Sequence, residues 1–380
     1  MIRDLNISGF KALEQVQLTD LGRVNLIVGP NGSGKSSLLY AIFIFCLDAN
    51  PEKLLDLFRN ESPHLDAQTF AENIRWLFYR QPHLRTVDWD RSRELHLEIT
   101  GSYESSDPTD GPSAVHDRAV SLYAEFRDSP LRPSGGSSHE SSRQSSEDID
   151  RVKDSATSIV RLTRRDNNNE VMGALYFSDG FGRYSEIPKG PPLIPASLTW
   201  PARSHMDLAK MWDKADIRGE AGNVIELLRH FDPEIVSIQI GVSTDGSPVL
   251  RIKHEHFGTT PLAIFGDGLA SALRTSLQIA MAQFSVVLID EFDSALHISV
   301  LRKLARFMCD CAQRTGTQLF LTTHRDDTVA AFANLGDTYS KAVVFHQTIL
   351  RGSSTEIQSY SALDTHEMLN DQGIDIRWPT

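Results

Sequence analysis

The sequence predicts an α/β fold that is interrupted by an antiparallel β lobe. Apolar strand-like runs alternate with helix-like segments over residues 1–93 and 260–380, which we assign to one α/β core. Residues 94–200 instead show the two-residue apolar period of half-buried strands. Residues 201–259 predict a helical segment and a hairpin. One domain with insertions explains this order better than three domains, so we assign residues 1–380 to a single domain.

The composition is that of an ordinary globular protein, with 380 residues of which 40% are hydrophobic and 23% charged. The net charge of −12 does not favour nucleic acid or an anionic membrane as a partner, although a local basic patch could still bind one. The cysteines form no spaced pairs, which argues against a disulfide framework or zinc site and for a reducing cytosol. We expect no signal peptide and no membrane span, and therefore a cytoplasmic protein.

A glycine-rich stretch, GPNGSGKSS, follows a predicted strand near the N-terminus. The strand is Arg23–Gly29, an apolar run that stops at a glycine, and Ser36–Leu47 after the stretch fits a buried helix or a strand by its own pattern. In this context the spacing G-x-x-x-x-G-K-[ST] is typical of a phosphate-binding loop, which makes the second run a helix. The alternative is a glycine-rich turn that happens to contain Lys-Ser.

Each part of this loop suits a nucleotide phosphate. Glycines let successive amides point into one concave surface, and the helix N-terminus adds a favourable dipole. Lys35 supplies a point charge for the β- and γ-phosphates, and the Ser36 hydroxyl can ligate Mg²⁺. The candidate nucleotide-binding residues are Gly29, Asn31, Gly32, Ser33, Gly34, Lys35, Ser36 and Ser37.

The lobe over residues 94–200 reads as consecutive antiparallel strands. The runs ELHLEI and VSLYAEF alternate apolar and polar residues, and further strands are expected near 158–164 and 170–178. Residues 132–150 are rich in serine and glycine and have almost no apolar side chains. This composition predicts a disordered surface loop.

The second half of the chain returns to alternating helices and strands. The runs HMDLAKMW and NVIELLRHF predict helices, and a hairpin is expected to turn at Asp245-Gly246. A helix over about 267–284, a strand over 285–290, a helix that stops at Gly316 and a strand over 318–324 follow.

Two of these strands end in residues that can carry chemistry. At the end of the run SVVLIDEF, Asp290 is placed to hold Mg²⁺ through water, and Glu291 to orient or deprotonate an attacking water. These acids could instead cap the following helix, but the phosphate loop would then lack its metal partner. His324 closes the next strand, either as a γ-phosphate sensor or as a plain polar residue at a strand exit.

The motifs GPNGSGKSS, FGDGLASAL, VVLIDEFDSALH and LFLTTH, in this order, resemble the ABC-type P-loop ATPase heads of the SMC/RecF class. They look closest to the ATPase portion of OLD-family (AAA, Old-like) proteins. The resemblance covers both ends of the chain and residues 200–330, whereas the lobe over residues 100–190 matches only in its strand-rich character. It implies a P-loop NTPase fold and hydrolysis of ATP with Mg²⁺.

The resemblance also implies roles for single residues. Lys35 and Ser36 would be the phosphate-loop residues, Asp290 the magnesium ligand, Glu291 the catalytic acid and His324 the switch histidine.

Further residues match the motifs that such heads use at their dimer interface. Asp267 and Gly268 stand in the signature loop Phe265–Ala270, which would meet the γ-phosphate of ATP held by a second subunit. The loop Asp293–His297 stands where relatives cross the dimer interface. Two departures are the absence of "SGG" from the signature and the phenylalanine in "DEFD".

Two residues outside these motifs also match positions near the nucleotide. Lys11 matches a basic residue that touches nucleotide in relatives. Gln81 is the nearest candidate for the glutamine that ligates Mg²⁺, with a plain surface glutamine as the alternative.

These features favour an ATPase whose homodimer, or higher homo-oligomer, encloses nucleotides and relays hydrolysis to a partner in DNA repair, DNA processing or anti-phage defence. OLD-family members often carry a Toprim nuclease, but only 56 residues follow His324. We therefore expect any effector, such as a nuclease, to be a separate chain. An ATP-gated scaffold with negligible turnover and a transporter's nucleotide-binding subunit are the alternatives.

The stretch Arg75–Arg93 mixes arginines with aromatic residues, which suits contact with nucleic acid. It fits better an amphipathic segment with buried aromatics and solvated or ion-paired arginines, because the chain as a whole is acidic. Direct DNA binding therefore stays an open question at the level of sequence.

Overall fold

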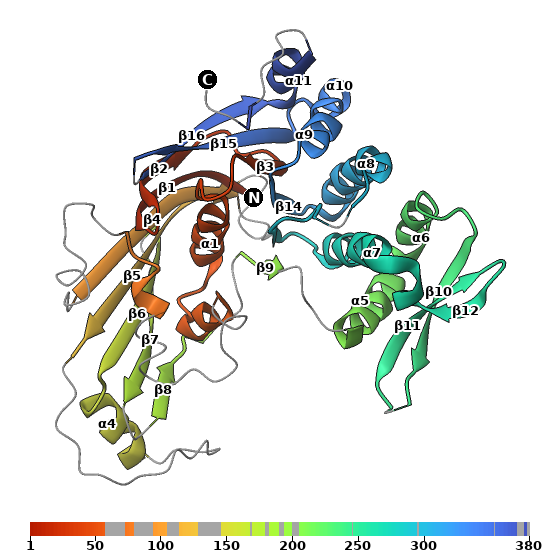
Figure 1. The fold of residues 1–380 in the computed structure, drawn as a ribbon. Coiled ribbons are helices and arrows are strands. Elements are labelled where there is room, and N and C mark those ends of the chain that lie inside the picture. Colours follow the sequence, from red (N-terminus) through yellow and green to blue (C-terminus); the bar gives the residue numbers. More distant parts are fainter. Residues whose placement is uncertain are drawn as a thin grey trace.

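The computed structural model describes most of the chain, and Figure 1 shows its fold. The described residues are 1–57, 73–79, 94–104, 114–127, 146–167, 169–178, 182–189, 194–199, 205–244, 246–294, 296–352, 354–370 and 376–377. Within them the strands form three sheets, and no helix is long and apolar enough to cross a membrane.

The central sheet carries the strands that end in the candidate site residues. Its order is β16-β15-β3-β14-β13-β9, and every neighbouring pair except β15 and β16 is parallel. Because parallel strands share one carboxyl edge, the ends of β3, β13 and β14 lie together. The strands are β3 (Val24–Val28), β9 (Ala196–Thr199), β13 (Val286–Ile289), β14 (Gln318–Thr323), β15 (Val343–Arg351) and β16 (Ser354–Ser361).

Both faces of the central sheet are buried, but in different clusters. Alternate residues of β13 show this: Val287 and Ile289 join the helices on one face, while Val286 and Leu288 join the opposite cluster. The central sheet thus belongs to both cores, which supports our proposal that residues 1–380 form one domain. The helices are α1 (Lys35–Cys46), α7 (Gly266–Met281), α8 (Ile298–Thr315), α9 (Asp326–Ala333), α10 (Gly336–Tyr339) and α11 (Ala362–Asn370).

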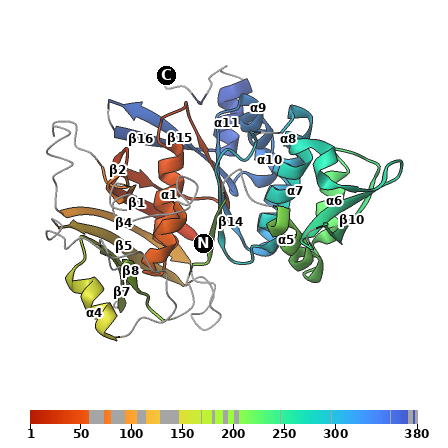
Figure 2. The same cartoon turned by 60° about the horizontal axis from the view of Figure 1, so that its bottom comes forward.

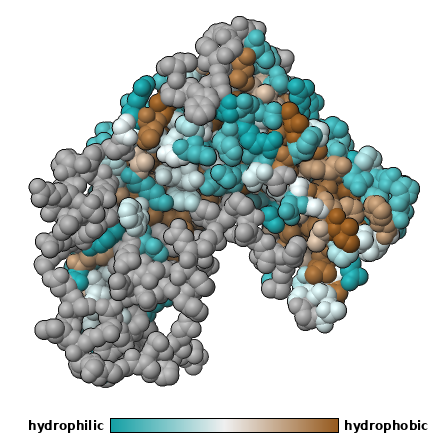
Figure 3. Space-filling model, in the orientation of Figure 1, coloured by the Kyte–Doolittle hydropathy of each residue, from teal (hydrophilic) through white to brown (hydrophobic). Residues whose placement is uncertain are grey.

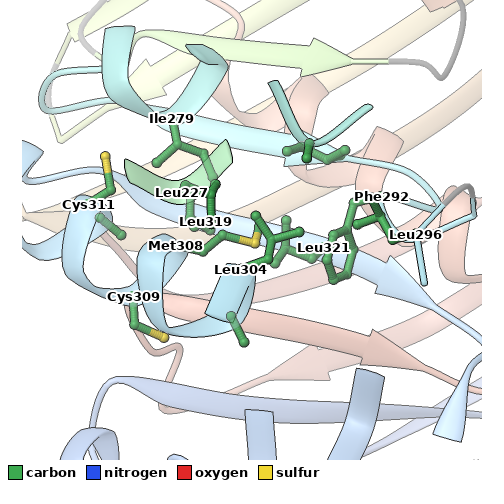
Figure 4. Packing of buried hydrophobic residues seen from close by; sticks show 14 of the residues in the cluster. Leu227, Ile279, Phe292, Leu296, Leu304, Met308, Cys309, Cys311, Leu319 and Leu321 are labelled. Carbon is green, nitrogen blue, oxygen red and sulfur yellow. The ribbon is translucent and has the colours of Figure 1, made fainter. Parts of the chain in front are cut away.

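The first cluster packs α7, α8 and α9 against the sheet. Figure 4 shows Leu304 and Met308 of α8 lying against Leu319 and Leu321 of β14. The helix α8 ends at Gly316, whose φ of 69° is the left-handed conformation of a helix stop, as predicted.

The second cluster places α1 between the central sheet and an antiparallel sheet of order β2-β1-β4-β5-β6-β7-β8. The predicted boundary at residue 94 is wrong in one respect, because the N-terminal strands β1 and β2 belong to this sheet through the pairing of β1 with β4. At the other end, β9 within residues 94–200 pairs with β13 in the central sheet. The strands are β1 (Ile2–Phe10), β2 (Leu13–Leu18), β4 (Glu94–Glu104), β5 (Val115–Phe126), β6 (Ser158–Asp166), β7 (Asn169–Ser178) and β8 (Gly182–Glu186), and the 3-10 helix η1 is Pro51–Leu57.

The predicted disordered loop over residues 132–150 needs a second correction. Residues 146–150 begin a helix, α4 (Ser146–Asp154). Its C-terminal half is fastened to the sheet, because Val152 is buried and Lys153 pairs with Glu186. These anchors lie beyond the serine-rich stretch, so its composition did not reveal them. Residues 132–145 lie outside the described residues.

A buried ionic cluster ties the antiparallel sheet to the C-terminal end of α1. Arg118 of β5 has a fully buried side chain and meets Asp166 at 2.7 Å. It also donates to the Phe45 carbonyl at 3.3 Å, which caps an orphan carbonyl of the last helical turn. Arg164 completes the cluster with Asp166 at 2.6 Å and with Asp48.

A smaller subdomain of helices and a hairpin packs against α7, and it contains the elements predicted for residues 201–259. The hairpin turns where expected, with Ser243 N donating to Ser247 O at 2.9 Å and Gly246 at φ 85°. Figure 3 shows hydrophobic surface over this part of the molecule, where Ile240, Val242, Phe257 and Ile264 are exposed. Its elements are α5 (His205–Ile217), α6 (Ala221–Leu228), β10 (Ile235–Val242), β11 (Pro248–His254), β12 (Gly258–Pro261) and the 3-10 helix η3 (Leu262–Phe265).

His346 of β15 is a buried imidazole beside the loop strand β3. Its Nε2 lies 3.2 Å from Asn25 Oδ1 and its Nδ1 lies 2.8 Å from Ser359 Oγ. Burial lowers the pKa of His346 from 6.5 to about 3. Below pH 6.5 the unfolded chain therefore binds a proton at this imidazole that the folded chain does not bind. The free energy of unfolding consequently falls as the pH falls from 6.5 toward 3.

Because of His346, we expect the free energy of unfolding to be about 1.4 kcal/mol lower at about pH 5.5 than at about pH 7.5. Urea unfolding at the two pH values should show this loss in the wild type and a smaller loss, by that amount, in His346→Gln. An identical pH dependence in both proteins would contradict the assignment.

Candidate functional site

The glycine-rich loop connects β3 to α1 and is pressed against β15 and β16. Gly34 adopts φ 95° at the start of α1, a conformation that favours glycine. A Cβ atom on Gly29 would lie 2.4 Å from Thr348 Oγ1, and one on Gly34 would lie 2.7 Å from Thr355 Oγ1. The two glycines therefore permit a close approach that any side chain would prevent.

Thr348 and Thr355 form hydrogen bonds to the loop. Thr348 Oγ1 lies 2.5 Å from Ser33 Oγ, and Thr355 Oγ1 donates to the Ser33 carbonyl at 3.1 Å. Asn31 and Gly32 at the loop tip are exposed, whereas Ser37 is half-buried in α1. Neither threonine could be predicted from its local sequence, because Thr348 and Thr355 reach the loop only through the pairing of β15 with β3 and of β16 with β15.

Lys35 is turned into the loop. The residue is 7% exposed, and its Nζ donates to the carbonyls of Gly29 at 2.9 Å and Pro30 at 2.8 Å. Burial lowers the pKa of Lys35, and the carboxylates of Asp290 and Glu291 oppose this effect. A polyanion bound in the loop would offset the same desolvation, so the cradle and its cation fit a phosphate chain.

Asp290 joins the loop to the end of β13. Ser36 Oγ donates to its Oδ2 at 2.8 Å, and Thr322 of β14 donates to Oδ1. Thr322 Oγ1 also accepts from Glu291 N at 2.8 Å, which links the two strand ends. A hydroxyl and a carboxylate side by side are oxygen ligands of the kind that Mg²⁺ prefers. Thr322 was not singled out from the sequence, although it lies in the LTTH motif.

Glu291 and His324 extend from the same edge of the sheet toward solvent. Glu291 has φ 44°, a rare conformation for a residue with a side chain, which redirects the chain at the end of β13. Its Oε1 lies 4.0 Å from His324 Nδ1, and the two side chains are 47% and 42% exposed. Water can therefore reach both groups beside Asp290.

Lys11 lies against α1, one helical turn beyond Ser36. Its ammonium is 4.4 Å from the ring centre of Tyr40. This places a positive charge close to the start of the loop helix, where the sequence resemblance expects nucleotide contact. Gln81, the predicted third magnesium ligand, lies outside the described residues.

Asp267 and Gly268 form the first turn of α7, and Asp267 is exposed. Figures 1 and 2 show α1 and α7 on opposite sides of β14. The same chain thus does not bring the predicted signature loop to its own phosphate loop. A second copy would be needed to join them.

The loop after Glu291 is fixed by a buried carboxylate. Asp293 has no exposed surface, and its Oδ2 accepts from Thr323 at 2.6 Å and from Thr328. Arg325 donates to the carbonyls of Asp293 at 2.9 Å and Leu296 at 2.5 Å. Because Thr323 and Arg325 flank His324, the loop that follows Glu291 is bonded to the residues on both sides of the histidine.

Only part of the loop Asp293–His297 can therefore meet another subunit. Ser294 and His297 are exposed, while Asp293 and Leu296 face the interior and Ala295 lies outside the described residues. The predicted interface role is thus confined to the exposed members.

In the stretch Arg75–Arg93, only residues up to 79 are described. Arg75 stacks on Phe126 at 3.8 Å from the ring centre, and Phe78 is buried. Trp76 is exposed. The described part therefore fits the amphipathic interpretation better than an open nucleic-acid surface.

A second group of potential metal ligands lies in the subdomain and is better explained by hydrogen bonding. Asp232, Glu234 and His254 bring their ligand atoms within 4.8 Å of one another. His254 Nδ1 accepts from the amides of His256 at 3.1 Å and Phe257 at 3.3 Å. The proton of neutral His254 must then sit on Nε2, which donates to Asp232 at 3.1 Å. A metal at Nε2 would require loss of that proton, so the group is structural.

The similarity of this chain to known proteins agrees with a site for nucleotide phosphates. Residues 24–330 match the family model described as "AAA domain, putative AbiEii toxin, Type IV TA system". An "ATP/GTP phosphatase" of Helicobacter pylori is 20% identical over 363 residues, which are 86% of this chain and 86% of that protein. An uncharacterised protein of Methanocaldococcus jannaschii is 26% identical over 100 residues, which are 26% of this chain and 41% of that protein.

The fold is similar to that of a solved SMC head. The crystal structure of the SmcHead bound to the C-winged helix domain of ScpA is 13% identical, and the match covers 95% of this chain and 97% of that chain with a TM-score of 0.54. The predicted fold class, an α/β P-loop ATPase head of the SMC type, is confirmed. The closer resemblance to the OLD family stays a prediction.

Proposed function

Because this chain belongs to the AAA-domain family that matches residues 24–330, we propose that it is a Mg²⁺-dependent ATPase that works as a nucleotide-enclosing dimer. The observation that carries this proposal is the contact between Ser36 of the loop helix and Asp290 of the neighbouring strand, at 2.8 Å, with Lys35 buried beside them. The name of the Helicobacter pylori relative, "ATP/GTP phosphatase", supports hydrolysis of a nucleoside triphosphate.

The loop residues would bind the phosphates of ATP. Lys35 exchanges its bonds to the Gly29 and Pro30 carbonyls for bonds to phosphate oxygens, and the amides of the loop and of the first turn of α1 complete the cradle. Ser36 and Asp290 would hold Mg²⁺, with Gln81 as a further candidate ligand. The ion, when bound, neutralises negative charge on the phosphates. Lys11, whose ammonium lies against Tyr40 of α1, would supply a further positive charge to the nucleotide.

Glu291 is the group we assign to the attacking water. Its carboxylate follows Asp290 at the end of β13 and is open to solvent, so it can accept a proton from water as the water oxygen bonds to the γ-phosphorus and the bond from that phosphorus to ADP breaks. His324, 4.0 Å away, is positioned to contact the γ-phosphate and so to report its presence. The hydrogen bonds around Asp293 would couple this contact of His324 to the loop that follows Glu291.

A second copy of the chain would complete each site. The helix α7, which begins at Gly266, lies on the other side of β14 from α1 (Figures 1 and 2), so we expect Asp267 and Gly268 to reach a phosphate held by a partner. The exposed Phe257 and Ile264 lie close in sequence to this helix start and give the surface an apolar contact. Ser294 and His297 would lie at the same interface.

We further propose that hydrolysis is relayed to a separate protein in DNA repair, DNA processing or anti-phage defence. The SMC head of similar fold was crystallised with a domain of ScpA, which supports a protein partner. The family description includes the words "putative AbiEii toxin, Type IV TA system", which we take as support for a defence role.

Phosphate release by the purified full chain tests this function. We expect ATP turnover that requires Mg²⁺ and disappears with a chelator, together with a doubling of the mass in light scattering when ATP is present. If ATP causes dimerisation but no phosphate is released, even with DNA and cell extract added, the protein is an ATP-gated scaffold and not an ATPase. An unchanged mass in the presence of ATP would contradict the proposed dimer.

A further inference from the structure

A cavity of about 360 Å³ lies on the opposite edge of the central sheet from Asp290. It is bounded by the starts of β9 and β13, by α5 and by the second half of α7, elements that can be followed in Figure 1. The parallel strands β9 and β13 present their amino ends here and their carboxyl ends at the nucleotide site. The cavity is therefore separate from the ATPase site, and its size is that of a small-molecule site.

One polar side chain inside the cavity is buried without a complete set of partners. Gln278 of α7 is 7% exposed, and its Nε2 donates to Ser197 Oγ of β9 at 3.4 Å. Its Oε1 has no hydrogen-bond partner among the described residues. Reversing the amide would leave Nε2 in that position, so in either orientation one polar atom remains for a ligand.

The charged residues among the described lining of the cavity are two arginines, and the acid that acts on Arg274, Asp267, lies outside that lining. Arg274 lies one turn before Gln278 on α7, and Arg218 follows α5 and donates to the Met281 carbonyl. None of the described lining residues is acidic. Guanidinium groups stay protonated at neutral pH and bind carboxylate or phosphate in a planar geometry. The polar side of the cavity therefore favours an anion.

Most of the remaining lining is apolar, although Gln283 and Ser285 also line the cavity. Leu208 and Met211 of α5 and Met281 of α7 line it, and methionine side chains adapt to ligands of different shape. A ligand that satisfies both sides must have an anionic group at the arginines and an apolar portion against α5. A bare inorganic anion would leave this wall without contact.

We propose that this cavity binds a small organic anion with one carboxylate or phosphate group and an apolar tail. The proposal is independent of ATP binding, since none of the lining residues belongs to the nucleotide site.

Calorimetric titration of the full chain without nucleotide tests this, with octanoate and octyl phosphate as probes. We expect saturable binding of at least one of these anions, about tenfold tighter than that of octanol, because a charge-assisted hydrogen bond distinguishes them. Octylamine should not bind. Preference for octanoate or for octyl phosphate would tell which acid group the site takes.

Two variants locate the binding in the cavity. Arg274→Gln should weaken binding of the anionic probe about tenfold. Gln278→Leu, which keeps the shape of the side chain, should also weaken it. Lys210→Gln removes an exposed charge from α5 outside the cavity lining and should have no effect. Octanol binding as tightly as the anions, equal losses in Arg274→Gln and Lys210→Gln, or no saturable binding of either anion would each overturn the proposal.

Discussion

Glu291→Gln is expected to slow ATP hydrolysis by about 10²–10⁴-fold while the affinity for ATP stays nearly unchanged. The amide has almost the shape of the carboxylate but cannot accept the proton of the attacking water. The ligands that we assign to binding, Lys35, Ser36 and Asp290, are untouched. ATP should therefore accumulate between two copies of the chain, so the dimer should be more stable than in the wild type.

Phosphate release, calorimetry and light scattering with ATP and Mg²⁺ measure these three effects on the same preparation. Glu226→Gln, at an exposed position of α6, is the matched control and should behave as the wild type. Turnover by Glu291→Gln within a factor of about three of the control would show that another group activates the water.

Arg118→Met is expected to lower the free energy of unfolding by about 3–5 kcal/mol. The substitution keeps most of the apolar stem but leaves Asp166 with a buried charge that only Arg164 now balances. It also uncaps the Phe45 carbonyl at the end of α1. Both losses fall in an interior without solvent to replace the missing bonds.

Urea unfolding provides the measurement, and the same sheet offers a control. Arg165 of the neighbouring strand pairs with Glu170 at 2.7 Å, but its side chain is 63% exposed. Arg165→Met should therefore cost no more than about 1 kcal/mol, as surface ion pairs do. If the two variants differ by less than about 1 kcal/mol, the cluster around Arg118 is not the junction that we describe.

The site residues that could be predicted from the sequence are those whose position is indicated by the residues next to them in the chain. Lys35 and Ser36 follow a strand and open a helix, and Asp290 and His324 end apolar strands. Once β3, β13 and β14 are parallel, their ends must meet at one edge, so the motifs converge without further information.

The rest depends on pairings between distant segments. Thr348 and Thr355 support the loop only because β15 lies next to β3, and nothing in their local sequence indicates it. Arg118 looks like a polar residue of a half-exposed strand until α1 covers it. For the same reason the sequence placed β1 in the α/β core and the residues of β9 in the antiparallel lobe, whereas β1 pairs with β4 and β9 with β13.

Uptake of Mg²⁺ and ATP, measured by calorimetry on the wild type and on Lys35→Ala, tests the central claim most directly. Thermal unfolding first establishes that the variant is folded. We predict one bound nucleotide per wild-type chain and at least a hundredfold weaker binding, about 3 kcal/mol, in Lys35→Ala. No uptake by the wild type, or equal uptake by both proteins, would contradict the assignment of the loop and of Asp290 to a nucleotide.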